Sequence, residues 1–390
     1  LGSFINRPDW MSGAEITYLV VLGLALTLLL PRWGPSTCAA IAFVAIAGGF
    51  GTAWAAFDQL GYLVDPVYPV VVVVLIYLAS TLIIYLRSEV EKRRVRGAFS
   101  RYMNPILVDQ LAASPERLKL GGEIRDMTVL FSDIRGFTTI SEQFDAEQLT
   151  RFINRFLTPM TQIILERRGT IDKYMGDGIM AFWNAPLDDP DHARHAGEAA
   201  LSMHARLMTF NDMLASEAAA AGRSHIPIAM GIGLNSGDCC VGNMGSDQRF
   251  DYSVLGDDVN LAARLESQSK IYHVDTVIGE HMAVKIPGFA LLELDKIQVK
   301  GKTHPVRVVA LHGDPAMKAD PAFEEIARDH ARMIEAYRAQ RWDEAVALIA
   351  KLRPCEPRMA AFYDHYLERI AEYRLSQLPA DWDGTYIATS

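Results

Sequence analysis

Two aspartates in this chain occupy settings that suit a pair of divalent cations. Asp133 follows the apolar run 127–131, and Asp177 lies between two glycines in a predicted turn. Carboxylates held on stiff backbone beside small residues are ligands that Mg²⁺ and Mn²⁺ prefer, and two such ions are what a triphosphate requires. Either aspartate alone would more often cap a turn or face solvent, so the inference depends on the pair. The pair indicates nucleotide chemistry.

The backbone after Asp133 offers a second feature of phosphate chemistry. Residues 135–138 read Arg-Gly-Phe-Thr, where a helix could begin. Exposed N–H groups at a helix start bind phosphate oxygens, and the helix dipole favours negative charge there. We therefore expect the loop from Ile134 through Phe137 to Thr138 to contact the phosphates of a nucleotide.

Short strands and helices alternate around these residues. Apolar, amphipathic and alanine-rich runs follow one another in the order strand 127–131, helix 147–167, hairpin 170–183, helix 192–214, strand 226–234 and helix 261–269. The hairpin carries Asp177 near its tip. This order predicts an α/β sandwich with the helices on one face of a sheet. Beyond residue 313 the pattern is helical and lacks strand signals, which predicts a helical appendage.

The first ninety residues carry most of the apolar excess of the chain. Over all 390 residues the hydrophobic fraction is 50% and the net charge is −9, and this acidic balance argues against a nucleic-acid partner. Three apolar stretches, 16–30, 38–57 and 67–86, predict three transmembrane helices in a lipid bilayer. Because none of the three contains an ionisable residue that would mark a path, a channel or transporter finds little support.

Basic residues set the expected orientation of these helices. Six Lys or Arg residues lie between positions 87 and 101, whereas the loop 58–65 has two aspartates and no Lys or Arg. The positive-inside rule therefore puts everything after Leu86 in the cytoplasm. We expect a multi-pass protein of the inner (plasma) membrane, with its N-terminus outside and its catalytic part in the cytoplasm.

These patterns divide the chain into five parts. We expect an external stub at 1–13, three transmembrane helices at 14–86, a juxtamembrane signalling helix at 87–122, a catalytic domain at 123–312 and a C-terminal helical extension at 313–390. The juxtamembrane part is charged and then amphipathic over 89–111, and Pro105 interrupts it. It either transmits a signal from the membrane or acts as a passive tether.

Three separate motifs together resemble the class III nucleotidyl cyclases. They are Phe131 to Thr138, Asp172 to Gly178 and Tyr252 to Arg264, and the resemblance covers roughly residues 121–311. It implies a ferredoxin-like α+β cyclase sandwich, preceded here by three membrane helices and followed by a helical tail. The membrane part resembles, more weakly, the three-span region of membrane-bound bacterial cyclases that follow an external, CHASE2-like sensor domain.

The resemblance implies metal-binding and base-binding roles. Asp133 and Asp177 correspond to the two metal-binding aspartates, with the Ile134 carbonyl as a further ligand of two Mg²⁺ or Mn²⁺ ions per site. Lys173 corresponds to a lysine that hydrogen-bonds adenine, and a donor there suits N1 of adenine and clashes with the N1–H of guanine. Ser253 stands at the second base-selecting position, where the animal enzymes often carry aspartate and many bacterial relatives carry threonine, and its hydroxyl can either donate or accept.

The resemblance also implies catalytic roles and a dimer. Asn260 and Arg264, four apart on one helix face, correspond to the ribose-positioning asparagine and the arginine that stabilises charge on the transferring phosphate. Lys300 corresponds to a lysine on the terminal phosphates. In this family the aspartates come from one subunit and the other contacts from its partner, so we expect a homodimer with two composite sites. The alternative is a plain helix surface, with Arg264 paired to Glu266 or Asp257.

The function implied is a membrane-anchored adenylate cyclase that converts ATP to 3′,5′-cyclic AMP and pyrophosphate. The ribose 3′-hydroxyl would attack the α-phosphate with the assistance of two metal ions. One alternative is a guanylate cyclase, which would be expected to carry glutamate in place of Lys173. Another is a catalytically silent nucleotide-binding sensor of the same fold, which would typically have lost an aspartate, Asn260 or Arg264.

Overall fold

The computed structural model describes residues 9–29, 35–99, 121–222, 227–246, 248–298, 305–376, 378 and 382–387. The chain divides into two compact units, Leu1–Ser114 and Pro115–Ser390. Each unit has a hydrophobic core of its own.

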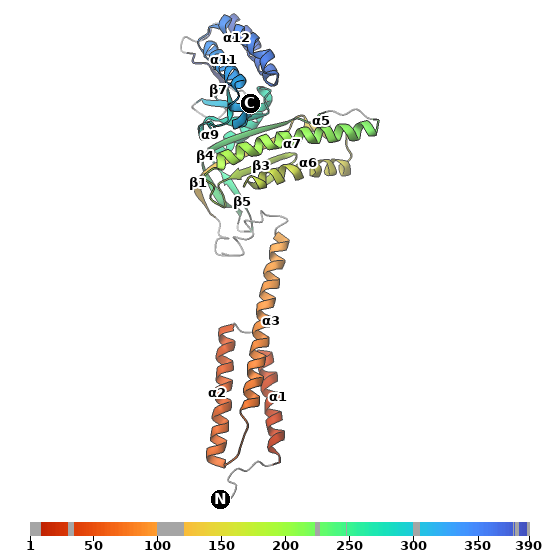
Figure 1. The fold of residues 1–390 in the computed structure, drawn as a ribbon, viewed down its shortest axis with the longest axis vertical. Helices are drawn as coiled ribbons and strands as arrows, with labels where there is room; N and C mark the ends of the chain where they lie inside the picture. The colour runs from red at the N-terminus through yellow and green to blue at the C-terminus, as the bar shows by residue number, and fades with distance from the viewer. Residues whose placement is uncertain are drawn as a thin grey trace. The chain divides into compact units, whose positions relative to one another are not determined.

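Three helices form the first unit: α1 (Met11–Leu29), α2 (Pro35–Leu60) and α3 (Val67–Phe99) (Figure 1). α3 packs against both α1 and α2. It begins in the apolar stretch 67–86 and continues without a break through the basic segment, so the last expected span and the start of the juxtamembrane helix form one element. Residues 100–120, where the rest of the juxtamembrane helix was expected, lie outside the described residues.

Two of these helices are long and apolar enough to cross a membrane. The segments are Thr37–Leu60 within α2 and Val67–Arg87 within α3, whereas the apolar part of α1, Met11–Thr27, is shorter. Large apolar side chains such as Phe43 and Trp54 are exposed on the helix surfaces, as in helices that are hydrophobic all round and face lipid. Two spans therefore have support from length and composition, and the third is not confirmed.

A nine-stranded sheet forms the centre of the second unit. Its order is β2-β3-β1-β4-β6-β8-β7-β9, with β5 paired to β4 off this path. The strands are β1 (Gly121–Ile134), β2 (Thr170–Met175), β3 (Gly178–Trp183), β4 (Met230–Ser246), β5 (Arg249–Leu255), β6 (Thr276–Gly279), β7 (Ala290–Gln298), β8 (Val306–Gly313) and β9 (Thr385–Ile387). The succession β1-α6-β2-β3-α7-β4, with strand order β4-β1-β3-β2, is the ferredoxin-like arrangement. The expected mixed α/β sandwich is confirmed.

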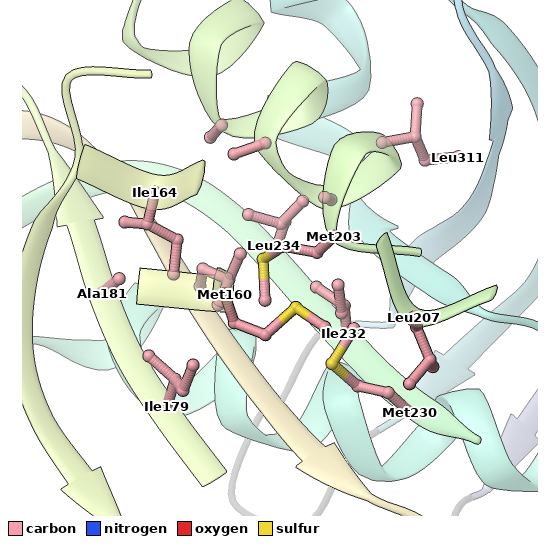
Figure 2. Close-up of a cluster of buried hydrophobic side chains, with 14 of the residues drawn as sticks. Met160, Ile164, Ile179, Ala181, Met203, Leu207, Met230, Ile232, Leu234 and Leu311 are labelled. Atoms are coloured by element: carbon pink, nitrogen blue, oxygen red, sulfur yellow. The ribbon is translucent and has the colours of Figure 1, made fainter. Parts of the chain in front are cut away.

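Two long helices, α6 (Ala146–Glu166) and α7 (His192–Ala220), cover one face of this sheet. Their apolar sides meet the sheet in a core that includes Met160, Met203 and Leu234 (Figure 2). α6 is strongly amphipathic, so burial of its apolar side against the sheet stabilises it more than helix propensity does. The helix-on-sheet layer expected from the sequence is present for these two helices.

One helix lies on the opposite face, and this corrects the expectation that the helices share one side. Along β4, Ile232 and Leu234 join the core beneath α6 and α7, whereas Gly233 between them faces α8 (Asp257–Ile271). Successive residues of a strand point to opposite faces, so α8 lies across the sheet from α7. A Cβ at Gly233 would lie 2.1 Å from the backbone nitrogen of Glu266, so this close approach of α8 requires glycine.

The remaining helices are short or follow the last long strand. They are α5 (Phe137–Ser141), α9 (Glu280–Lys285), α10 (Pro315–Lys318), α11 (Pro321–Arg338), α12 (Trp342–Cys355), the 3₁₀ turn η3 (Pro357–Met359) and α13 (Ala360–Leu375). A buried ion pair of 2.6 Å joins Arg369 of α13 to Asp295 of β7. The expectation that no strand follows residue 313 is wrong, because β9 pairs in parallel with β7. With only three residues, β9 is too short to leave an alternating pattern in the sequence.

Candidate active site

β1 and the β2–β3 hairpin bring the two aspartates together at one end of the sheet. Asp133 is the last residue but one of β1, and Asp177 lies in the turn between β2 and β3. β1 pairs antiparallel with β3, with Ser132 opposite Ile179. The Asp177 carboxylate accepts a hydrogen bond of 3.1 Å from the backbone N–H of Ile134. The hairpin tip is therefore fixed against the end of β1.

Two glycines permit this close approach. Gly176 has a φ of +69°, a conformation that strongly favours glycine. A Cβ at Gly178 would lie 2.9 Å from the carbonyl oxygen of Ser132 and 3.3 Å from Oδ1 of Asp133. A larger residue at position 178 would push the hairpin away from the Asp133 carboxylate.

The titration of Asp133 is perturbed in a way that suits a divalent cation. Partial burial of the carboxyl group, the charge of Asp177 and a hydrogen bond with it raise the pKa of Asp133 to about 7, and Glu266 adds to the effect. Like charges this close disfavour ionisation of both groups unless a cation lies between them. Metal binding would release the proton of Asp133 and leave its carboxylate ionised. The pair therefore fits the metal role expected from the sequence.

Protein side chains alone would not complete a metal site here. No group of three or more His, Cys, Asp or Glu side chains able to hold a metal occurs in the described part of the chain. Mg²⁺ is commonly bound by one or two carboxylates together with substrate phosphates and water. The two aspartates and the backbone after them match that pattern.

A second cluster contains the two residues expected to read the base. The Ser253 hydroxyl of β5 donates a hydrogen bond of 2.6 Å to Oδ2 of Asp172 in β2. Nζ of Lys173 lies 3.4 Å from Oδ1 of the same carboxylate. Burial raises the pKa of Asp172, while the contacts with Ser253 and Lys173 act in the opposite direction. Asp172 thus contacts both of the residues that the sequence predicted to read the base.

Asp172 had no role in the sequence reasoning, although it lies inside one of the motifs. Strand pairing between β2 and β3 shifts between Ile171 and Lys173, which indicates a bulge at Asp172. A bulge changes the direction of the side chains beside it. Regular alternation would have put Asp172 and Lys173 on opposite faces, so the sequence offered no signal that both serve one site.

α8 carries Asn260 and Arg264 on the side away from its own sheet. Asn260 is exposed and Arg264 is half-buried, whereas the intervening Leu261 is buried. These positions do not decide between the proposed roles and the alternative in which Arg264 pairs with Glu266 or Asp257.

The remaining expected site residues have different outcomes. Phe137 and Thr138 open the short α5, after Gly136 with a φ of +67°. The Phe137 side chain packs against the core beneath α6 and α7, so its backbone is the part that could face phosphate. Thr138 is exposed. Lys300 lies outside the described residues.

Comparison with known proteins agrees with this architecture. Residues 122–313 match the family described as the adenylate and guanylate cyclase catalytic domain. The ferredoxin-like core and the paired aspartates lie within these residues. The chain therefore carries a class III adenylyl/guanylyl cyclase catalytic domain.

Individual relatives are similar over about half of the chain. An adenylate cyclase of Anabaena cylindrica is 34% identical over 223 residues, which are 55% of this chain and 43% of that protein. Adenylate cyclase 1 of Rhizobium meliloti is 31% identical over 188 residues, 46% of this chain and 27% of that protein. The chain thus spans less than half the length of these curated relatives. The crystal structure of the adenylyl cyclase CyaB from P. aeruginosa is 36% identical over 49% of this chain and 96% of that one, with a TM-score of 0.43.

Proposed function

We propose that this protein is a membrane-anchored adenylate cyclase that converts ATP to 3′,5′-cyclic AMP and pyrophosphate. The observation that carries the proposal is the Asp133–Asp177 pair, in which the pKa of Asp133 is raised by burial and by its neighbour. Two Mg²⁺ or Mn²⁺ ions at this pair would activate the ribose 3′-hydroxyl and neutralise charge on the phosphates. The Ile134 carbonyl is proposed as a further ligand, and the backbone of residues 137–138 as a phosphate contact.

The other residues of the domain bind and orient the nucleotide. Lys173 donates to N1 of adenine, and Ser253 faces the exocyclic amine. Asn260 holds the ribose so that its 3′-hydroxyl lies in line with the α-phosphate, where Arg264 stabilises the charge that develops. Lys300 contacts the terminal phosphates. Lys173 favours ATP over GTP. Its ammonium group offers only hydrogen-bond donors, which suit the acceptor N1 of adenine and clash with the N1–H donor of guanine.

Each site is proposed to need two chains. The 3.6-residue period of α8 places Glu266 about 200° around the helix from Arg264. Glu266 contributes to the raised pKa of Asp133 and is itself affected by Asp177, so its side of α8 is the one near the aspartates. Arg264 consequently faces away from the aspartates of its own chain. It would serve the aspartates of a second copy.

An exposed apolar row supports contact with that second copy. Ile124 of β1, Cys240 of β4 and Leu255 of β5 are direct cross-strand neighbours. Ile124 is 77% exposed and Leu255 is 60% exposed. Apolar side chains gathered on a protein surface are typical of protein–protein interfaces. A homodimer would cover this row and complete both composite sites.

Attachment to the lipid bilayer is part of the same proposal. α2 and α3 have the length and composition of membrane spans, and we propose α1 as a third span. The basic residues that follow the apolar part of α3 would keep the catalytic unit on the cytoplasmic side of the inner membrane.

Membranes from cells that express the full chain, incubated with Mn²⁺ and either ATP or GTP, test the proposal. We expect cyclic AMP and pyrophosphate in equal amounts from ATP, and much less cyclic GMP from GTP. A preference for GTP would make the protein a guanylate cyclase. Binding of ATP without any turnover would indicate a silent nucleotide sensor.

A further inference from the structure

Asp172 lies beneath the two residues proposed to read the base, and it is almost completely covered. Its side chain is 1% exposed, whereas that of Lys173 is 50% exposed. Ser253 is also buried, at 7% exposure. The carboxylate therefore cannot meet a nucleotide directly, and any effect it has on the base must pass through its two neighbours.

The chemistry of a carboxylate restricts what Ser253 can offer. An ionised carboxylate only accepts hydrogen bonds. Burial raises the pKa of Asp172, whereas the Ser253 hydroxyl and the Lys173 ammonium at 3.4 Å favour its ionised form. With the carboxylate ionised, the Ser253 hydroxyl is the donor in the 2.6 Å contact with Oδ2 of Asp172. The hydroxyl hydrogen of Ser253 is then used in the bond to Asp172, so only the lone pairs of the oxygen remain to accept a hydrogen bond from a ligand.

Lys173 and Ser253 then present one donor and one acceptor side by side. Adenine offers the matching pair on its Watson–Crick edge, an acceptor at N1 and a donor at the 6-amino group. Guanine offers the reverse, a donor at N1 and an acceptor at O6. A serine that was free to rotate could satisfy either base, since its hydroxyl can donate or accept.

We infer that Asp172 is a specificity-determining residue, which makes the site select the 6-amino group of adenine by fixing the direction of the Ser253 hydroxyl. The bulge in β2 at Asp172 gives this arrangement its structural basis, because it lets two consecutive residues serve one site. The inference rests on the proposed function and adds to it a positioning residue that does not touch the substrate.

Purine riboside triphosphate isolates the contact in question. This ATP analogue keeps the N1 acceptor and lacks the 6-amino group, so it loses only the partner of Ser253. We would measure kcat/KM for ATP and for the analogue with the full chain in detergent, in wild type, Asp172→Asn, Ser253→Ala and the double variant. The ratio of kcat/KM for ATP to kcat/KM for the analogue is measured on one preparation of each variant, so it does not depend on the fraction of folded enzyme.

The wild type should prefer ATP over the analogue by roughly tenfold, the effect of one well-placed hydrogen bond. Asp172→Asn should reduce this ratio to about two or less, because an amide can donate as well as accept and leaves the hydroxyl free to turn. Ser253→Ala should reduce it equally, and the double variant should show no further change. Asp251→Asn, which removes an exposed carboxylate two residues away on β5, is the matched control and should leave the ratio unchanged.

A purely structural role for Asp172 predicts a different result. Turnover of both nucleotides would fall together and the ratio would stay at its wild-type value, which would overturn the inference. Independent, multiplicative effects of Asp172→Asn and Ser253→Ala would overturn it as well. Asp172→Ser, which also replaces a pure acceptor by a group that can donate, carries the same prediction if Asp172→Asn yields no active protein. A wild type that turns over neither ATP nor GTP would instead reject the proposed function, and this inference with it.

Discussion

At the scale of single residues, the proposed chemistry rests on two carboxylates, Asp133 and Asp172, whose ionisation depends on neighbouring groups. Burial and Asp177 raise the pKa of Asp133 to about 7, so near neutral pH this group is poised to exchange a proton for a cation. Asp172 instead meets an ammonium and a hydroxyl group and stays covered by protein. The first arrangement suits metal binding, and the second suits positioning of a neighbour.

Replacement of Asp133 by asparagine tests the metal role. Asp133→Asn keeps the size of the side chain and removes the charge, so we expect cyclase activity to fall by at least about a hundredfold. Mn²⁺ binding, followed by electron paramagnetic resonance, should weaken in parallel while the dimer persists in size-exclusion chromatography. Asp343→Asn is the control, because that side chain is 99% exposed and pairs with Arg374 in the tail. Wild-type rates in Asp133→Asn would remove the basis of the assignment.

The sequence predicts part of this site because part of it is local. The turn that holds Asp177 has its own signal in the flanking glycines. Asp172 depends on a bulge against β3 and on a hydrogen bond to a residue 81 positions away. No short-range pattern records either feature, so its role could be recognised only in the folded chain.

At the scale of elements, Gly233 of β4 sets the position of α8, the helix that carries Asn260 and Arg264. α8 lies so close to β4 that a Cβ at Gly233 would be 2.1 Å from the Glu266 nitrogen and 2.4 Å from the Ala262 carbonyl oxygen. Both neighbours are backbone atoms and cannot rotate away. The strand therefore sets how far α8, and Asn260 and Arg264 with it, stands from the sheet.

Gly233→Ala should displace α8 and lower both stability and activity. Overpacking against backbone of this kind costs roughly 3 kcal/mol, which urea unfolding of the detergent-solubilised chain can measure. Cyclase activity should fall as well, because Asn260 and Arg264 move with the helix. Gly288→Ala, where a Cβ would meet nothing within 4 Å, is the matched control. Equal stability and activity in the two variants would contradict this role of the strand.

The docking of the tail should depend on pH through a buried histidine. Nε2 of His330 donates to the Glu293 carbonyl at 2.6 Å, and the Tyr363 hydroxyl lies 3.1 Å from Nδ1. Burial lowers the pKa of His330 from 6.5 to about 4. As pH falls, His330 therefore binds a proton near pH 6.5 in the unfolded chain but only near pH 4 in the folded chain. The contribution of His330 to stability is consequently full above pH 6.5 and is lost as pH falls toward 4.

The loss in the free energy of unfolding that comes from protonation of His330 amounts to at most about 3 kcal/mol. Urea midpoints measured between pH 7 and pH 4.5 should fall more steeply for the wild type than for His330→Gln, which keeps a donor for Glu293 and does not titrate in this range. Parallel pH profiles of the two proteins would show that His330 does not carry the effect.

Which face of a sheet a helix covers is harder to predict than the helix itself. The positions of α6, α7 and the hairpin were predicted because their periodicities are strong and local. α8 was expected on the same face as the others, and only the close contacts at Gly233 reveal that it lies opposite. β9 has three residues and exists through its pairing with β7. In both cases long-range packing decides the outcome.

At the scale of the whole molecule, one compact unit contains two apolar helices long enough to span a membrane, and the other contains the cyclase domain. The apolar runs predicted the first unit, although two of its helices rather than three reach the length and composition of a span. Each chain would supply one pair of aspartates and one set of base, ribose and phosphate contacts to two different sites. The functional unit is then a dimer, and a single chain is expected to be nearly inactive.

Complementation between two inactive chains tests this central claim most directly. Asp133→Asn and Arg264→Ala chains, carrying different tags, are expressed separately and together, and cyclic AMP formation from ATP is measured in membranes. Each variant alone should be nearly inactive. With random pairing, half of the dimers are mixed and each has one intact site, so co-expression should restore about a quarter of wild-type activity. If mixed dimers recovered through both tags stayed inactive, both half-sites would have to belong to one chain, and the account of a composite site would be contradicted.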